Sequence, residues 1–332
     1  MSDLRHKQSM DAIARRALLD SWGLALLSLR CVAGEEGRQC FRAATDHGHF
    51  FVKVQENLGE YFDDIVHGLR VQQYVREQGL PTNDVVRTTS GELCAVVDDH
   101  GIVVEPWVQS EPNEPTSRHW EEFGRIVGQL HSLPVSDELA ACPSKMDPRR
   151  NLERLRSNLS QFTEHIPREY RASLERFIEF ADQLDDLPEA PRSLIHSDLA
   201  WSNVVMARNG QLLLVDFEGA GFGPAVVDLV EVTTYLCRGP SASGPLMEDA
   251  ARAFYRGYRE HRALCTVEIE LLERAHLFHQ LYYLENSLTR GDYDFLRRMS
   301  ARLDNWQGGV LSQLAEVMVE DAPADCVRNA YA

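Results

Sequence analysis

The residues most able to do chemistry lie in one stretch of the chain, between His196 and Asp228. Asp198 follows His196 by two residues and precedes Asn203 by five, and Asp216 closes an apolar run further on. A carboxylate placed like Asp198 can orient an attacking hydroxyl and accept its proton. Carboxylate and amide oxygens are ligands that Mg²⁺ takes in proteins. The stretch therefore suits phosphoryl transfer, which needs a positioned hydroxyl and a metal on the phosphates.

A hairpin is predicted inside this stretch. Two short apolar runs, 204–207 and 212–215, are joined by an Asn-Gly pair. Asn-Gly between apolar runs is the strongest short hairpin signal, because both residues tolerate positive φ. Asn203 precedes the first strand and Asp216 closes the second, so the hairpin should bring them to the same end.

The elements ahead of this stretch are predicted to form a small antiparallel sheet with one helix. Glycines and an aspartate separate short runs of apolar and β-branched residues, which is typical of strands joined by tight turns. The order begins with a helix over 10–29. It continues with strands over 29–32, 40–45 and 50–55, a helix over 61–77, and strands over 85–87, 94–98 and 102–104.

Beyond a connector at 110–117, which holds two prolines, the pattern is mainly helical. The predicted helices cover 120–130, 151–162, 170–184, 246–261, 267–288 and 293–314. An alternating βαβ pattern, typical of a doubly wound sheet, is absent from the sequence. The fold class is therefore α+β, with a small sheet lobe followed by a larger helical lobe.

Composition excludes several classes of function. The 332 residues include 51 acidic and 34 basic side chains, a formal net charge of −17, which argues against a nucleic-acid partner. The same balance is compatible with a cationic small-molecule partner. No apolar run approaches the roughly 18 residues that span a bilayer, and the amino end has no signal-peptide core. Seven scattered cysteines without a CxxC pair favour a reduced, cytoplasmic protein with no membrane partner.

The spacing HxDxxxxN, followed by a strand that ends in Asp-Phe, resembles the protein-kinase-like fold. The wording HSDLAWSN with VDFEGAGFGPAVVDL is more similar to the aminoglycoside phosphotransferase family, which includes homoserine- and choline-kinase-like enzymes. The resemblance covers about residues 29–288 and is specific over 194–229. It implies a bilobal fold, with a nucleotide-binding lobe at 1–105 and a lobe with the catalytic loop at 106–332.

The resemblance assigns roles to individual residues. Asp198 matches the catalytic aspartate, while Asn203 and Asp216 match the ligands of Mg²⁺. Lys53, in FFVKV, matches the lysine that contacts the α- and β-phosphates of ATP, for which GTP is an alternative. These matches imply nucleotide and magnesium as cofactors.

The stretch VVEPW matches the hinge between the lobes, where backbone groups read adenine. Glu105 would give the carbonyl and Trp107 the N–H. Pro106, which has no N–H, falls where none is needed.

Three features depart from the family pattern. The loop 33–38 carries two glutamates in place of a GxGxxG motif, and glutamates would repel phosphates. The acidic partner of Lys53 is expected in the helix 61–77, where Asp64 is the preferred candidate. Ala200 stands where relatives carry a lysine or histidine, so charge there must be neutralised from elsewhere.

These observations predict a magnesium-dependent kinase of a small polar molecule. About a dozen residues separate Asp216 from Asp228, too few for the activation segment of a protein kinase. The preferred acceptor is an aminoglycoside or nucleoside antibiotic; the alternatives are a metabolite such as homoserine, choline or a sugar, or a pseudokinase that only binds nucleotide. Acids of the helical lobe that could face a cationic acceptor are Glu218, Glu231 and Glu285. The sequence carries no signal for an oligomeric state.

Overall fold

The computed structural model describes residues 9–35, 37–56, 61–110, 114–237 and 243–319. The chain forms two compact units. The first joins residues 1–111 to the segment 205–218, and the second joins 112–204 to 219–332. The segment that carries Asp216 therefore belongs to the unit that carries Lys53, whereas Asp198 and Asn203 belong to the other. The lobe boundary expected at 105/106 stays a prediction.

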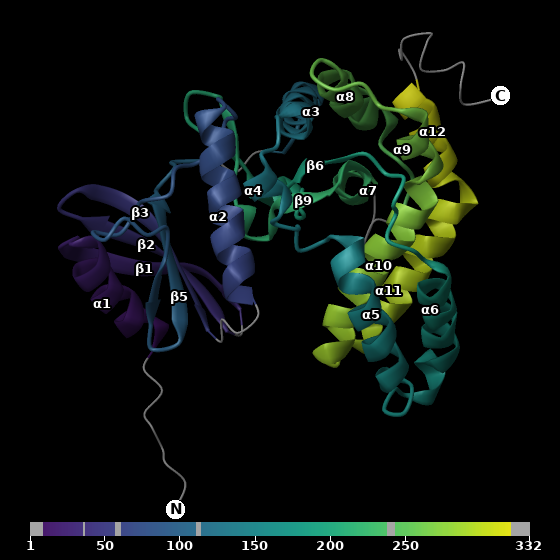
Figure 1. Cartoon of the computed structure of the whole chain (residues 1–332), viewed down its shortest axis with the longest axis horizontal. Coiled ribbons are helices and arrows are strands. Elements are labelled where there is room, and N and C mark those ends of the chain that lie inside the picture. The colour runs from purple at the N-terminus through teal and green to yellow at the C-terminus, as the bar shows by residue number, and fades with distance from the viewer. Residues whose placement is uncertain (1–8, 36, 57–60, 111–113, 238–242, 320–332) are drawn as a thin grey trace, which may run out of the picture. The chain divides into compact units, whose positions relative to one another are not determined.

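A five-stranded sheet forms the centre of the first unit (Figure 1). Its antiparallel strands follow the order β1-β2-β3-β5-β4, which confirms the predicted small antiparallel sheet. The strands are β1 (Leu26–Glu35), β2 (Arg38–Thr45), β3 (Gly48–Glu56), β4 (Ala95–Val97) and β5 (His100–Pro106).

Two expectations about this unit are wrong. Helix α1 (Met10–Trp22) ends well before residue 29, because Gly23 takes a left-handed φ of 66° and residues from Leu26 onward pair with β2. The run 85–87 is not a strand, although the Val86 N–H donates to the Val104 carbonyl.

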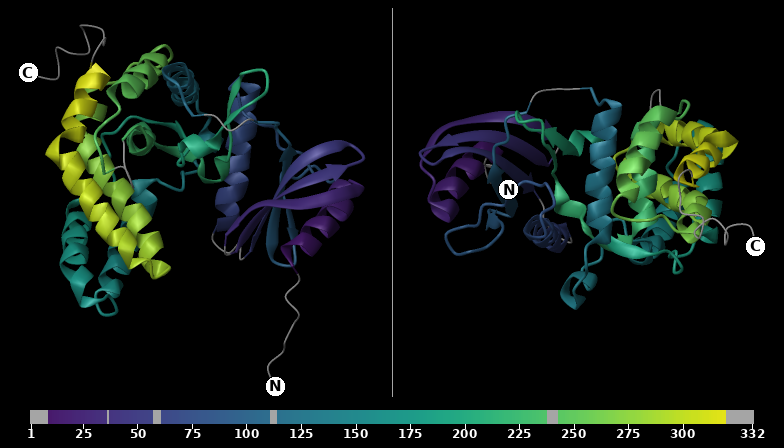
Figure 2. Two further views of the ribbon diagram at one scale, coloured as in Figure 1. Left: turned by 180° about the vertical axis from the view of Figure 1, so that it is seen from behind. Right: turned by 90° about the horizontal axis from the view of Figure 1, so that it is seen from above.

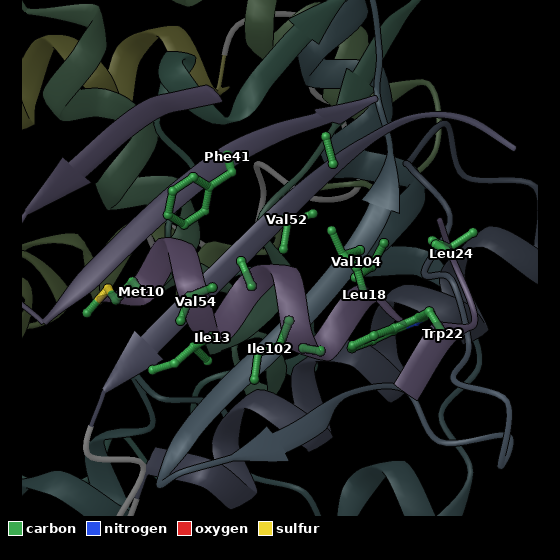
Figure 3. Close-up of a cluster of buried hydrophobic side chains, with 13 residues drawn as sticks. Met10, Ile13, Leu18, Trp22, Leu24, Phe41, Val52, Val54, Ile102 and Val104 are labelled. Atoms are coloured by element: carbon green, nitrogen blue, oxygen red, sulfur yellow. The ribbon is translucent and has the colours of Figure 1, made fainter. Parts of the chain in front are cut away.

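Helices cover the two faces of this sheet (Figure 1). Side chains alternate between the faces along a strand, so Val52 and Val54 share one face and Lys53 points to the other. The first face packs against α1, and Figure 3 shows the cluster that results. Ile65 and Leu69 of α2 (Tyr61–Glu77) pack on the second face. The placement of Lys53 towards α2 thus follows from strand alternation.

The predicted Asn-Gly hairpin forms between β7 (Val204–Met206) and β8 (Leu212–Leu214). Its second strand is tied to the first unit by the Leu214 N–H, which donates to the Pro81 carbonyl at 2.9 Å. Ala207 forms an isolated bridge with Ser110.

The second unit is mainly helical (Figure 2), as expected from the pattern. Its helices are α3 (Ser117–Ser132), α4 (Asp137–Ala140), α5 (Pro148–Phe162), α6 (Arg171–Gln183), α7 (Ala225–Leu236), α8 (Glu248–Arg259), α9 (Thr266–Glu270), α10 (Leu272–Thr289), α11 (Tyr293–Asn305) and α12 (Leu311–Val319). The helix expected over 267–288 is interrupted at Leu271, and the one over 293–314 by a π turn with Gly309 at φ 148°. None of the described helices combines the length and apolar character needed to cross a membrane.

A two-stranded sheet of β6 (Arg192–Ile195) and β9 (Gly221–Pro224) was not expected from the sequence. The loop that carries Asp198 starts directly after β6, and β9 leads directly into α7. Each strand has four residues, too short to give a periodic signal.

Helices α3 and α8 approach each other with glycine at the contact. A Cβ on Gly124 would lie 1.9 Å from the Phe254 carbonyl oxygen, and one on Gly257 would lie 1.9 Å from the Glu121 carbonyl oxygen. Hydrogen atoms alone fit in such spaces, so the glycines set the separation of the two helices.

Gly124→Ala is expected to lower the free energy of unfolding by about 1–3 kcal/mol, because overpacking forces the backbones apart. At a helix position with free space, the same substitution would stabilise the protein by up to about 1 kcal/mol, because alanine favours the helix more than glycine does. The expected change at Gly124 therefore has the opposite sign. Gly308→Ala is the matched control, since a Cβ there meets no heavy atom within 4 Å. Urea denaturation followed by circular dichroism measures the free energy of unfolding of both variants. Equal stability of the two would contradict the role of Gly124 in the close contact of α3 and α8.

Candidate active site

Lys53 is a buried cation held by two carboxylates of the first unit. Its side chain is 8% exposed, and Nζ lies 2.8 Å from Asp216 Oδ1 and 2.9 Å from Glu218 Oε1. Burial favours the neutral amine, but the charges of Asp216 and Glu218 outweigh it and raise the pKa of Lys53. Lys53 is therefore a fixed positive charge on the α2 side of the sheet.

Asp216 follows β8 in an uncommon backbone conformation, with φ at 69°. The segment after it forms one turn of 3₁₀ helix, in which Phe217 is fully buried. Helix α2 meets this turn at Gly68, where a Cβ would lie 2.0 Å from the Phe217 carbonyl oxygen. Glycine at this position lets α2 press against the turn that presents Asp216 and Glu218.

The described ion pairs of Lys53 are made to the segment after the hairpin, not to α2. Asp64, the acid preferred from the sequence, lies on α2 but is not among these partners. Helix α2 contributes Gln72 instead of an acid, and Gln72 Nε2 donates to Glu105 Oε1 at 2.7 Å.

The Glu105 side chain lines the same narrow pocket as Lys53 and Asp216. The carboxyl is 9% exposed, and burial raises its pKa, although the bond from Gln72 and the charge of Lys53 act in the opposite direction. Glu105 thus brings a further acid towards Lys53, from β5. The sequence had indicated a role only for the Glu105 backbone carbonyl, in reading adenine.

Backbone groups at the expected hinge already have partners within the first unit. The Trp107 N–H donates to the His49 carbonyl at 2.9 Å, and the Pro106 carbonyl accepts from Asn83 Nδ2 at 2.9 Å. A base bound here would have to take the Trp107 N–H from His49. Recognition of adenine by Glu105 and Trp107 stays a prediction.

In the second unit, Asp198 lies in a loop whose backbone is anchored on both sides. Ahead of it, the N–H groups of His196 and Ser197 donate to Asp228 of α7 at 2.7 and 2.9 Å. His131 Nε2 lies 3.1 Å from the same carboxylate. Ser197 is held at a left-handed φ of 69°. Asp228 therefore braces the backbone of the loop ahead of Asp198.

Glu231, one turn further along α7, anchors the other side of the loop. The Leu199 N–H donates to Glu231 Oε2 at 3.1 Å, and the Tyr283 hydroxyl donates to Oε1 at 2.8 Å. Glu231 is 1% exposed. Burial, followed by the charges of Glu231 and Asp198, raises the pKa of Tyr283 well above its usual value. The three-residue spacing between Asp228 and Glu231 is the sequence signal that could have indicated this pair of anchors.

Asn203 contacts Asp198 directly. Its Nδ2 donates to the Asp198 backbone carbonyl at 2.9 Å and to Oδ2 at 2.8 Å, from a 3₁₀ turn at Trp201–Asn203. Donation from the amide nitrogen turns the amide oxygen away from Asp198. The structure thus brings together Asp198 with Asn203 in one unit, and Lys53 with Asp216 in the other.

The three acids expected to face an acceptor all have protein partners. Glu218 pairs with Lys53, and Glu231 holds the loop. Glu285 is 3% exposed and lies 3.3 Å from Arg154 Nη2, with a further bond from Asn158. Contact of these acids with an acceptor stays a prediction.

Asp216 and Asn203, each in its own unit, carry oxygen ligands of the kind that a hard divalent cation takes, and their joint binding of one metal stays a prediction. Asp216 offers a carboxylate at the end of β8, and the Asn203 oxygen points away from the bond to Asp198. Within the described part of the chain, no three His, Cys, Asp or Glu side chains gather as a metal site of their own.

Residues 28–264, well over half of the chain, match the sequence model of the Phosphotransferase enzyme family, abbreviated APH. The chain belongs to this family. The resemblance found in HSDLAWSN and VDFEGAGFGPAVVDL is thereby confirmed, and so is the kinase-like α+β fold.

Relatives of this phosphotransferase act on several acceptors. Homoserine kinase of Pseudomonas aeruginosa strain UCBPP-PA14 is 25% identical over 247 residues, which are 74% of this chain and 75% of that protein. The solved structure of spectinomycin phosphotransferase with ADP and spectinomycin superposes with a TM-score of 0.63 at 15% identity, covering 95% of this chain and 98% of that one. The solved structure of ethanolamine kinase of Plasmodium vivax superposes with a TM-score of 0.66 at 12% identity, covering 93% of this chain and 91% of that one. The protein is a small-molecule kinase with a hydroxyl acceptor.

Glu231→Gln is expected to lower kcat on the order of ten- to a hundredfold, because a loosened loop misplaces Asp198. The KM for the acceptor should change little, and hydrogen exchange at the Leu199 amide should become faster. Tyr283→Phe, which removes only the bond to Oε1, should give a smaller change of the same kind. A raised acceptor KM with unchanged kcat would instead make Glu231 a contact of the acceptor.

Proposed function

We propose that this kinase transfers the terminal phosphoryl group of ATP, with Mg²⁺, to a hydroxyl of a small amine-bearing molecule. An aminoglycoside or nucleoside antibiotic is the leading acceptor, and the cytoplasm is the proposed location. The observation that carries the proposal is the anchored loop, in which Asp228 and Glu231 take the N–H groups on both sides of Asp198. Such anchoring is what a general base needs to keep its orientation.

The proposed roles follow the groups in each unit. Asp198 orients the acceptor hydroxyl and takes its proton, while Asn203 holds one carboxylate oxygen of Asp198. Lys53 binds phosphate oxygens as a charge that burial does not neutralise. Asp216 and Asn203 would hold Mg²⁺, which when bound neutralises charge on the phosphates.

Two observations support a cationic acceptor. The acceptors named for the relatives, homoserine, ethanolamine and spectinomycin, each combine a hydroxyl with an amine. The charges of Asp198 and Glu231 also extend to Tyr235, 41% exposed on α7; burial, followed by these charges, raises its pKa to about 12. A negative field around Asp198 would attract an ammonium group.

A metabolite with both an amine and a carboxylate, such as homoserine, is the second candidate. The observation that favours it is Arg302 of α11, a half-buried guanidinium close enough to Tyr235 and Tyr283 to interact with both electrostatically. Burial lowers its pKa to about 10, while both tyrosines act in the opposite direction. A cation in this region would suit an acceptor carboxylate.

A panel of acceptors tests the proposal, with phosphate transfer from ATP measured for aminoglycosides, nucleosides, amino alcohols, homoserine and sugars. The affinity for the best acceptor should fall markedly between low and physiological ionic strength, because salt screens the attraction. The affinity for ATP should not fall in parallel. A neutral or acidic acceptor with salt-independent affinity would reject the cationic acceptor, and ATP binding without turnover on any acceptor would favour a pseudokinase.

Asp198→Asn should leave nucleotide affinity nearly intact and lower turnover roughly a hundred- to ten-thousandfold, the usual contribution of a general base.

Asp216→Ala, in contrast, should change nucleotide binding. It should abolish the gain in nucleotide affinity that Mg²⁺ provides, because a carboxylate ligand is lost. Calorimetry with a non-hydrolysable ATP analogue, with and without Mg²⁺, and steady-state rates measure both. Near-normal turnover of Asp198→Asn would reject its assigned role.

A further inference from the structure

Arg38 lies on the same face of the sheet as Lys53. It is the first residue of β2, and its neighbour on that face, Cys40, pairs with Lys53 across the β2–β3 ladder. Cross-strand partners and residues two apart on a strand share a face. The turn ahead of Arg38 is fixed to β3, because the Glu56 N–H donates to the Gly37 carbonyl at 2.8 Å. The sheet therefore directs the Arg38 side chain to the side of Lys53.

Arg38 and Lys53 contact the two oxygens of one carboxylate. Arg38 Nη2 lies 3.0 Å from Asp216 Oδ2, and Lys53 Nζ lies 2.8 Å from Asp216 Oδ1. The Arg38 side chain is 31% exposed, so it is partly open to solvent, whereas Lys53 is buried. Burial favours neutral Arg38, but Asp216 and Glu218 more than compensate and raise its pKa. Two permanent cations thus share Asp216.

A metal on Asp216 would change this arrangement. A carboxylate that donates its electron pairs to a divalent cation has less negative charge left for the two side chains beside it. Glu218 remains with Lys53, but Arg38 then needs another anion. A guanidinium binds phosphate oxygens through two parallel N–H bonds, which an ammonium cannot do. A phosphate bound to the same metal would offer Arg38 such an anion.

We infer that Arg38 binds the terminal phosphate of the nucleotide, exchanging Asp216 for it when the metal binds. The inference rests on the proposed use of ATP and Mg²⁺. Lys53, which is expected to contact the α- and β-phosphates, pairs with Asp216 Oδ1, whereas Arg38 pairs with Oδ2. We therefore assign the remaining γ-phosphate to Arg38. Arg38 would also supply positive charge in a reaction whose transferred phosphoryl group must be neutralised in place.

Calorimetry on the full chain without an acceptor tests this role with ATP, ADP and AMP, each with Mg²⁺. Arg38→Gln should weaken ATP about ten- to a hundredfold, the range expected for hydrogen bonds to a charged group, and leave ADP and AMP nearly unchanged. Arg38→Lys should fall between, because it keeps the charge and loses the two-bond geometry. Arg30→Gln, an exposed arginine on β1, is the control and should bind all three as the unchanged protein does.

Other outcomes overturn the inference. Unchanged ATP affinity in Arg38→Gln shows that no phosphate is bound there, and tighter binding shows that Arg38 competes with the metal for Asp216. Equal losses for ATP, ADP and AMP point to a disturbed sheet, which thermal unfolding of the same variant checks independently. If the unchanged protein binds neither ATP nor ADP, the proposed phosphate donor itself is wrong and the inference falls with it.

Discussion

The charge of Lys53 is the constraint on which the first unit depends. A buried ammonium is tolerated only beside carboxylates, and removal of one partner of a buried pair typically costs about 3–5 kcal/mol. Asp216 and Glu218 supply these carboxylates. Their placement requires the left-handed backbone at Asp216 and the close approach of α2 at Gly68. The hairpin therefore belongs structurally with a sheet from which it is separated by about a hundred residues of sequence.

In the second unit, carboxylates again act as the anchors, here for backbone N–H groups. The loop around Asp198 has buried N–H groups that need acceptors, and α7 offers two carboxylates one turn apart. The carboxylates of Asp228 and Glu231, on one helix, thus accept the loop's N–H hydrogen bonds that a neighbouring strand would otherwise accept. The loop can leave β6 through a strained residue, Ser197, because these bonds over-determine its path. In both units, carboxylates hold the groups that we propose for the reaction.

Local patterns predicted much of this arrangement, and the remainder depends on contacts between distant residues. The Asn-Gly hairpin, the strand with Lys53 and the spacing of Asp198 from Asn203 are local signals, and the structure contains each element. The partners of Lys53 were sought in α2 because a resemblance suggested a helix acid, whereas they come from beyond the hairpin. From the sequence, Glu231 was a candidate contact of the acceptor, and only the fold shows that its carboxylate accepts from the Leu199 N–H. Helical periodicity likewise continues through Leu271, where the backbone does not.

The origin of the acids on Lys53 has a consequence for how the binding groups are coupled. If a helix acid held Lys53, the lysine could keep its place whatever happened at the metal ligand. Here Asp216 is at once the partner of Lys53, the partner of Arg38 and the expected ligand of the metal. A metal that draws on Asp216 also changes the electrostatic surroundings of both cations, which strengthens their attraction for phosphate at the same moment. Metal and phosphates would then bind together, and Glu218, which pairs with Lys53 at 2.9 Å, would keep the lysine in position.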